Sequence, residues 1–166
     1  MGIKRPLIVL VVSVLSFWAL DLATVESRSP RGYAASRPLG GAPLPDEVPP
    51  YHNKAPRKQL PPTMDPLRFP DGITRNAYAM AGRIKEVLYQ QPCYCHCDRE
   101  YGHASLLECF TGTHAAVCNI CKMEAIYAYN ETAKKKTAAQ IREGIINGEH
   151  QKIDLAKYLE YKPLSD

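Results

Sequence analysis

All six cysteines of this chain lie between residues 93 and 121, and three of its five histidines lie among them. Thiolates and imidazoles bind soft and borderline metal ions, and thiols alone can form disulfides. A chain that concentrates both residue types in one short window is expected to use it either to bind a metal or to cross-link its fold. The chemistry of the protein is therefore predicted to lie between residues 93 and 121.

The cysteines fall into three groups along the chain: Cys93, Cys95 and Cys97, then Cys109 alone, then Cys118-x-x-Cys121. If residues 93–97 are extended, alternate residues point the same way and their three sulfurs share one face. If these residues form a tight turn, the turn could instead wrap the three sulfurs around one ion. Residues three or four apart on a helix are neighbours, so His114 is expected to extend the stripe that begins at Cys118. We therefore expect a loop with three sulfurs to face a helix with two sulfurs and an imidazole.

Nine side chains are candidate metal ligands. The leading candidates belong to the loop and the helix: Cys93, Cys95, Cys97, Cys118 and Cys121. Residues that stand between or beside these groups come next, Cys109, His103 and His114, followed by His96. Six thiolates exceed what one tetrahedral zinc ion requires, and thiolate sets favour soft metals. Copper(I) is the preferred ion, because it is the soft metal expected outside the cytoplasm, and zinc is the alternative.

Disulfides are the competing interpretation. An exported domain with a small core and an even number of cysteines is well suited to stabilisation by disulfide bonds. The protein would then hold no metal and would act as an interaction module or an accessory subunit of an envelope complex. A thioredoxin-like oxidoreductase is disfavoured, because that chemistry needs Cys-x-x-Cys at the start of a helix that follows a strand, and Cys118 is expected in the second turn of its helix. We therefore do not expect an enzyme.

The N-terminal residues are typical of a targeting segment. Lys4 and Arg5 precede an apolar run from Leu7 to Leu20, which is shorter than the roughly 20 residues of a spanning helix. Residues 1–25 are therefore expected to be a signal peptide or an uncleaved signal anchor that attaches the protein to the membrane. The rest of the chain is expected in the periplasm or on the extracytoplasmic face of the membrane.

Composition divides the remainder into two parts. Eleven of the 14 prolines lie between residues 30 and 70, so residues 26–70 are expected to be a disordered, semi-rigid linker. Residues 71–166 have helical periodicity and no β-hairpin or βαβ pattern, which predicts an all-α domain of three or four helices around a Cys/His-rich loop. Residues 72–166 carry 12 Lys and Arg against 11 Asp and Glu, a balance that argues against nucleic-acid binding.

Four helices are expected in this domain. The first carries apolar residues from Ile73 to Leu88, starts at a capping Asp71 and ends before Pro92. A short helix is predicted over residues 102–110 and a longer one over residues 113–135. The pattern TAAQ at residues 137–140 predicts a capping box that opens the last helix, which Asn147-Gly148 ends. Residues 149–166 are expected to add only a packing strand or helix.

The segment PCYCHC, residues 92–97, resembles the naming motif of the PCYCGC family of exported bacterial proteins, which are often lipoproteins and have no assigned activity. The resemblance covers about residues 80–150 and continues through Gly102-His103-x-Ser105-Leu106, Cys109-Phe110, Cys118-x-x-Cys121 and Glu124-Ala125. His96 stands where the motif has Gly, and a lipid-accepting Cys near the N-terminus is missing. The resemblance implies a bacterial envelope protein, for which an envelope metalloprotein or membrane complex is the expected partner.

Overall fold

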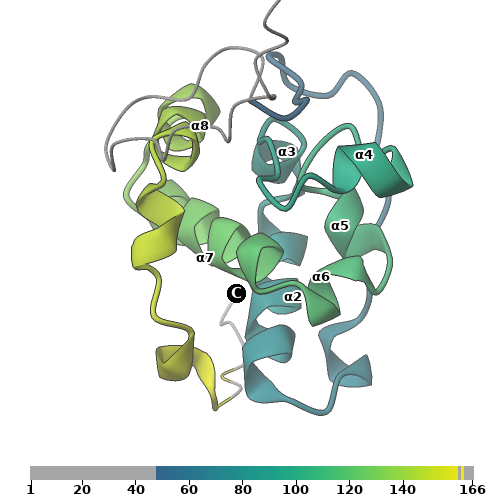
Figure 1. Ribbon diagram of the computed structural model, residues 1–166, viewed down its shortest axis with the longest axis vertical. Coiled ribbons are helices and arrows are strands. Elements are labelled where there is room, and N and C mark those ends of the chain that lie inside the picture. The colour runs from purple at the N-terminus through teal and green to yellow at the C-terminus, as the bar shows by residue number, and fades with distance from the viewer. Residues whose placement is uncertain (1–47, 161, 163–166) are drawn as a thin grey trace, which may run out of the picture. The chain divides into compact units, whose positions relative to one another are not determined.

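The computed structural model describes residues 48–160 and residue 162. Every regular element in these residues is helical, which confirms the predicted all-α fold. In chain order they are η2 (Pro66–Arg68), α2 (Gly72–Arg83), α3 (Lys85–Leu88), α4 (Cys97–Tyr101), α5 (Glu108–Thr111), α6 (His114–Val117), α7 (Asn119–Ala133), α8 (Ala138–Ile146), η3 (Glu149–Lys152) and η4 (Leu155–Tyr158) (Figure 1). Seven α-helical segments stand in these residues where three or four helices were expected, because several are single turns.

The predicted targeting segment, residues 1–25, lies outside the described residues. None of the helices in residues 48–160 combines the length and the hydropathy that crossing a bilayer requires.

Helix α7 organises the core. It packs against α2, α3, α6, α8 and η3, and Figure 1 shows it between α8 on one side and α4, α5 and α6 on the other. Ala77 and Ala81 of α2 are fully buried, and so are Ala125 and Ala128 of α7. Small side chains on both helices allow their backbones to approach closely. This packing fixes the position of α7, whose first turn carries candidate ligands.

The first predicted helix is two helices. Asp71 caps α2 as expected, because its Oδ1 accepts a hydrogen bond from the Thr74 amide at 2.8 Å. The helix ends at Ile84, whose φ of −124° and ψ of 33° are not helical, and α3 follows. Gly82, in the last turn of α2, is a local signal for this end that the apolar periodicity did not include. Ile84 and Leu88 are both buried, so the chain packs into the core on each side of the break.

The last predicted helix begins and ends as expected. The Thr137 hydroxyl and the Gln140 side chain form the capping box of α8, and Gly148 follows its end with a φ of 77°. Gly144 lies in the middle of α8, because a Cβ atom at that position would collide with the Tyr127 hydroxyl of α7. This glycine therefore lets α7 and α8 pack closely.

The Pro-rich segment lies against the helices where it is described. Residues 48–70 have no regular secondary structure apart from η2, yet the Met64 amide donates a hydrogen bond to the Phe110 carbonyl at 2.9 Å. Phe69 is buried against Tyr78, with ring centroids 4.2 Å apart. A free tether would make no such tertiary contacts. The proline content alone had predicted a free tether.

The chain after α8 forms two 3-10 turns, η3 and η4, in place of the strand or helix that was expected. The Asn76 amide on α2 donates hydrogen bonds to the carbonyls of Tyr158 and Glu160, at 2.9 and 2.8 Å. A buried polar side chain of α2 therefore holds the C-terminal turns in place.

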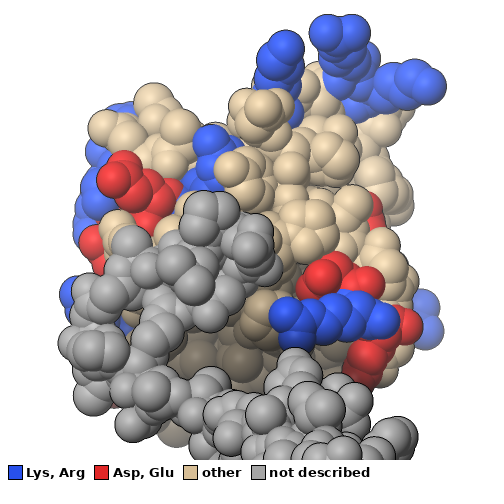
Figure 2. Space-filling view, turned by 45° about the horizontal axis from the view of Figure 1, so that its top comes forward, with Lys and Arg blue, Asp and Glu red and all other residues tan. Residues whose placement is uncertain are grey.

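Charged residues on the described surface are scattered. On the face shown in Figure 2, Lys and Arg project from the upper edge, and elsewhere acidic and basic residues stand side by side around an uncharged surface. This face has no continuous basic stripe of the kind that tracks a phosphate backbone.

Candidate metal centre

The cysteine loop is a tight turn. The His96 amide donates to the Cys93 carbonyl at 3.2 Å, and His96 has a left-handed backbone with a φ of 56°. Cys97 follows as the first residue of α4. Of the two geometries the alternate spacing allowed, the structure has the turn. The left-handed conformation also explains why the motif has Gly where this chain has His96, because only Gly adopts it without strain.

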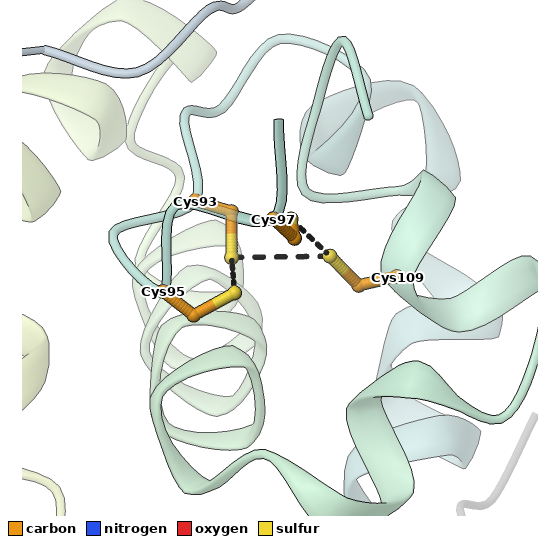
Figure 3. A group of neighbouring side chains, drawn as sticks. All are labelled: Cys93, Cys95, Cys97 and Cys109. Atoms are coloured by element: carbon orange, nitrogen blue, oxygen red, sulfur yellow. Dashed lines mark hydrogen bonds between the residues drawn. The ribbon is translucent and has the colours of Figure 1, made fainter. Parts of the chain in front are cut away.

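The turn aims its three thiols at other elements of the fold. Figure 3 shows the sulfurs of Cys93, Cys95 and Cys97 turned toward Cys109, which comes from α5. The sulfur–sulfur distances are 3.3 Å for Cys93–Cys95, 3.3 Å for Cys97–Cys109, 3.8 Å for Cys93–Cys109, and 3.5 Å for both Cys93–Cys121 and Cys95–Cys121. Loop and helix sulfurs therefore meet in one place.

Two imidazoles border the sulfurs. His114 Nε2 lies 3.4 Å from the Cys95 sulfur, and His103 Nδ1 lies 3.4 Å from the Cys109 sulfur. The two imidazoles pack edge to face with their centroids 5.3 Å apart. They therefore lie on the same side of the sulfur cluster.

The helix expected over residues 113–135 is broken at Cys118, which corrects the prediction of one stripe through His114, Cys118 and Cys121. Cys118 has an extended backbone, with a φ of −112° and a ψ of 111°, and it is the N-cap of α7. Lys122 on α7 donates from Nζ to the Ala116 carbonyl at 3.1 Å and so stabilises the end of α6. The break places Cys118 and Cys121 at the N-terminus of α7, where the helix dipole favours negative charge.

The donor atoms satisfy the geometry of a thiolate-bound metal. Cys93, Cys95, Cys97 and Cys109 hold their ligand atoms within 4.8 Å of one another, and so do Cys95, Cys109, His114 and Cys121. Around a tetrahedral ion with metal–sulfur bonds of about 2.3 Å, sulfurs are about 3.8 Å apart. The observed sulfur–sulfur distances of 3.3–3.8 Å are close to this value. This Cys/His cluster can hold a metal ion.

No pair of cysteines is joined by a disulfide. All six are free thiols, and the shortest sulfur–sulfur distance is 3.3 Å, well above the roughly 2.05 Å of a disulfide bond.

Hydrogen bonds among the thiols move their pKa values in opposite directions. Bonds from Cys109 and other neighbouring thiols lower the pKa of Cys95, and bonds from Cys121 and Cys93 lower the pKa of Cys109 to about 3. The hydrogen bond with Cys109 correspondingly raises the pKa of Cys93, Cys97 and Cys121.

The centre has a buried side and an open side. Cys93, Cys97, Cys109 and Cys121 are buried. Cys95, Cys118, His103 and His114 are partly exposed, and near them Tyr101 and Val117 are 60% and 87% exposed. These partly exposed residues therefore mark the side of the centre that lies nearest to solvent.

The structure orders the predicted ligands differently from the sequence. Cys109, ranked second, belongs to both four-donor groups, whereas Cys118, ranked first, belongs to neither and contacts Cys95 and Cys121 from the edge. His96 lies outside both groups, and its ring packs near Tyr94 with centroids 6.3 Å apart. Spacing ranked Cys109 low because an isolated cysteine has no neighbour in sequence, and the contact with Cys97 is formed only by tertiary folding.

A buried polar pair behind the sulfurs was missed by the sequence analysis. Glu124, fully buried on α7, accepts a hydrogen bond from the Tyr94 amide in the cysteine turn at 2.7 Å. Its Oε1 lies 4.0 Å from Nε2 of the buried His150. Burial raises the pKa of Glu124 well above its usual range and lowers that of His150. The one available signal was a carboxylate three residues after Cys121, on the buried face of a helix.

The family described as a protein of unknown function with PCYCGC motif matches residues 52–153. The chain belongs to the PCYCGC family. The match confirms the resemblance seen in the cysteine spacing and extends it to the Pro-rich segment that packs on the core. No curated protein and no solved structure matches the chain.

Proposed function

We propose that this PCYCGC-family protein is an exported soft-metal-binding protein that prefers copper(I) to zinc and acts in metal handling or delivery. The observation that carries the proposal is the convergence of free thiols from four parts of the chain: the turn, α4, α5 and the start of α7. Buried thiols that only packed would need no imidazoles beside them, whereas soft metals bind both donors.

Two properties of the donors favour copper(I): most of them are soft thiolates, and there are more of them than one zinc ion requires. One zinc ion would be satisfied by four donors, and the group Cys93, Cys95, Cys97 and Cys109 already supplies four sulfurs. Cys121 and His114 form a second group with two of these. A sulfur set larger than one zinc site requires is suited to a soft monovalent ion that thiolates bind in clusters.

Handling or delivery is favoured over a purely structural role because the centre is open on one side. An exchange of metal with a partner needs ligands that the partner can reach, and Cys95, Cys118 and His114 are partly exposed here. Exposed ligands can be exchanged for those of an incoming donor or acceptor, for which an envelope metalloprotein or a membrane complex is the proposed partner. Export rests on the targeting segment predicted over residues 1–25.

One structural observation supports the alternative of an oxidoreductase: Cys118-x-x-Cys121 begins at the N-terminus of α7. That chemistry requires a lowered thiol pKa. A contact with Cys121 lowers the pKa of Cys118, but the contact with Cys95 and burial leave it raised. No strand precedes α7 in the described residues. Metal binding is therefore the better supported function.

The test is elemental analysis of the full-length chain, purified without oxygen, together with thiol titration in denaturant. We expect copper or zinc in the native protein and six titratable thiols without added reductant. Thiols that become titratable only after reduction, with no metal present, would instead identify a disulfide-stapled interaction module.

A double variant separates the centre from the fold. Cys93→Ser with Cys121→Ser removes two sulfurs that meet at 3.5 Å between the turn and α7, and we expect this variant to lose copper(I) binding while α8 remains helical. His52→Ala, a histidine that stacks on Tyr89 away from the cluster, is the control and should bind like the wild type. Full binding by the double variant would contradict the proposal.

A further inference from the structure

The two four-donor groups overlap in a specific way. The sulfurs of Cys95 and Cys109 belong to both groups, while Cys97 belongs only to the first and His114 only to the second. The six residues of the combined set exceed the four donors of one tetrahedral ion. The combined set therefore provides two adjacent metal-binding positions that have the sulfurs of Cys95 and Cys109 in common.

Cys95 and Cys109 are placed to bridge these positions. The Cys95 sulfur lies 3.3 Å from that of Cys93 on one side and 3.4 Å from His114 Nε2 on another. The Cys109 sulfur lies 3.3 Å from that of Cys97 and 3.8 Å from that of Cys93, both in the first group, and within 4.8 Å of the ligand atoms of Cys121 and His114 in the second. A thiolate has several lone pairs and can bind two ions at once, whereas an imidazole nitrogen has one and binds a single ion.

Charge favours a second ion. Five of the six donor residues are cysteines, of which Cys93, Cys97, Cys109 and Cys121 are buried. A metal ion binds sulfur only after the thiol has lost its proton, and a buried thiolate that coordinates no ion is strongly unfavourable. A second cation therefore allows more of the five cysteines to coordinate as thiolates than one ion would.

We infer that the centre binds two copper(I) ions bridged by the sulfurs of Cys95 and Cys109. One ion is held on the side of Cys93 and Cys97, and the other on the side of Cys121 and His114. This inference rests on the proposed function, because it specifies the nuclearity of the same centre.

The first test is anaerobic titration of the reduced full-length chain with copper(I) in competition with a copper(I) chelator. We expect saturation at two ions per chain and, by X-ray absorption of the loaded protein, a copper–copper scattering path. Saturation at one ion would overturn the two-ion inference and leave the proposed function standing. Absence of binding would overturn both. Two ions without copper–copper scattering would overturn the bridging.

Single variants then separate bridging from terminal ligands. Cys97→Ser and His114→Ala should each weaken one of the two binding steps by roughly tenfold or more and leave the other almost unchanged. Cys95→Ser, which removes a bridge, should weaken both steps. His52→Ala is the matched control for His114→Ala and should leave both steps unchanged. Equal effects of all three site variants would contradict the assigned bridging role, provided that far-ultraviolet circular dichroism shows a retained helical fold.

Discussion

The helical body, made of α2, α7 and α8, and the thiol segment, residues 92–118, are stabilised in different ways. In the body, α2 and α8 have side-chain caps, and α7 has eight buried residues between Cys121 and Glu131. In the thiol segment, α4, α5 and α6 have four or five residues each, and none has a side-chain cap. Helices this short are not stable alone in water, because nucleation is unfavourable.

The thiol segment is therefore held by what surrounds it. The Leu106 amide donates to the Gln91 carbonyl at 3.0 Å, and Tyr78 of α2 donates from its hydroxyl to the Gly112 carbonyl at 2.7 Å. Further support comes from the Met64 amide, which donates to the Phe110 carbonyl, from the buried side chains of Leu106 and Phe110, and from the contacts among the thiols. We therefore expect the body to fold without a metal and the order of the thiol segment to depend more strongly on one.

Metal removal should give the largest effect. Withdrawing copper(I) with a strong chelator under reducing, anaerobic conditions is expected to accelerate amide hydrogen exchange throughout residues 92–118 by about tenfold or more, because metal binding contributes directly to folding. Exchange in α8 should change little. Equal acceleration in both regions would show that the two are not separate in stability.

Glu124 joins the two regions, so its loss should have the next largest effect. Glu124→Ala leaves the buried Tyr94 amide without its acceptor and should lower the free energy of unfolding by about 1–3 kcal/mol. Glu124→Gln retains an acceptor oxygen and should lower it less. Denaturant unfolding of the reduced, metal-free protein provides the measurement. Equal losses in both variants would exclude the hydrogen bond as the cause.

His150 should make stability depend on pH. Its burial lowers its pKa below the usual value of 6.5, so the unfolded chain binds a proton that the folded chain does not. Stability is then complete above pH 6.5 and is lost as the pH falls below it. The raised pKa of Glu124 acts in the opposite direction, since that contribution is lost as the pH rises above 4.5.

The effect of His150 is best isolated in the Glu124→Gln background, by denaturant unfolding of the metal-free protein at a series of pH values. Adding His150→Gln should flatten the decline below pH 6.5. An undiminished decline would assign it to other groups.

The two regions should also differ in their response to capping variants. Thr137→Ala removes the side-chain cap of α8 and should lower the free energy of unfolding by about 1 kcal/mol. Thr113 stands at the same position before α6 but makes no side-chain cap bond, so Thr113→Ala should be nearly neutral. Thermal or denaturant unfolding measures both, and equal losses would remove this distinction between the regions.

The smallest expected effect comes from the two left-handed positions. His96→Gly relieves the strain of a left-handed His and should raise the free energy of unfolding by up to about 1 kcal/mol. Gly148→Ala, in the body, introduces that strain and should lower it by about the same amount. A destabilised His96→Gly variant would indicate that the His96 side chain makes a contact worth more than the strain.

The sequence by itself was enough for the elements that depend on local chemistry. The caps at Asp71 and Thr137, the end of α8 at Asn147-Gly148, and the all-α class follow from residues that act on their own backbone neighbourhood. The family, too, was evident from the cysteine spacing, because PCYCHC and the later cysteines occur together in one short window.

Tertiary structure alone decided which donors meet. The break at Ile84 follows Gly82 in the last turn of α2, whereas the break at Cys118 has no Gly or Pro beside it, and the apolar periodicity predicted neither. The Cys118 break moved that residue to the edge of the cluster, while the solitary Cys109 reached its centre through α5. Linear spacing records which residues are neighbours along the chain, but a metal centre depends on contacts between distant segments.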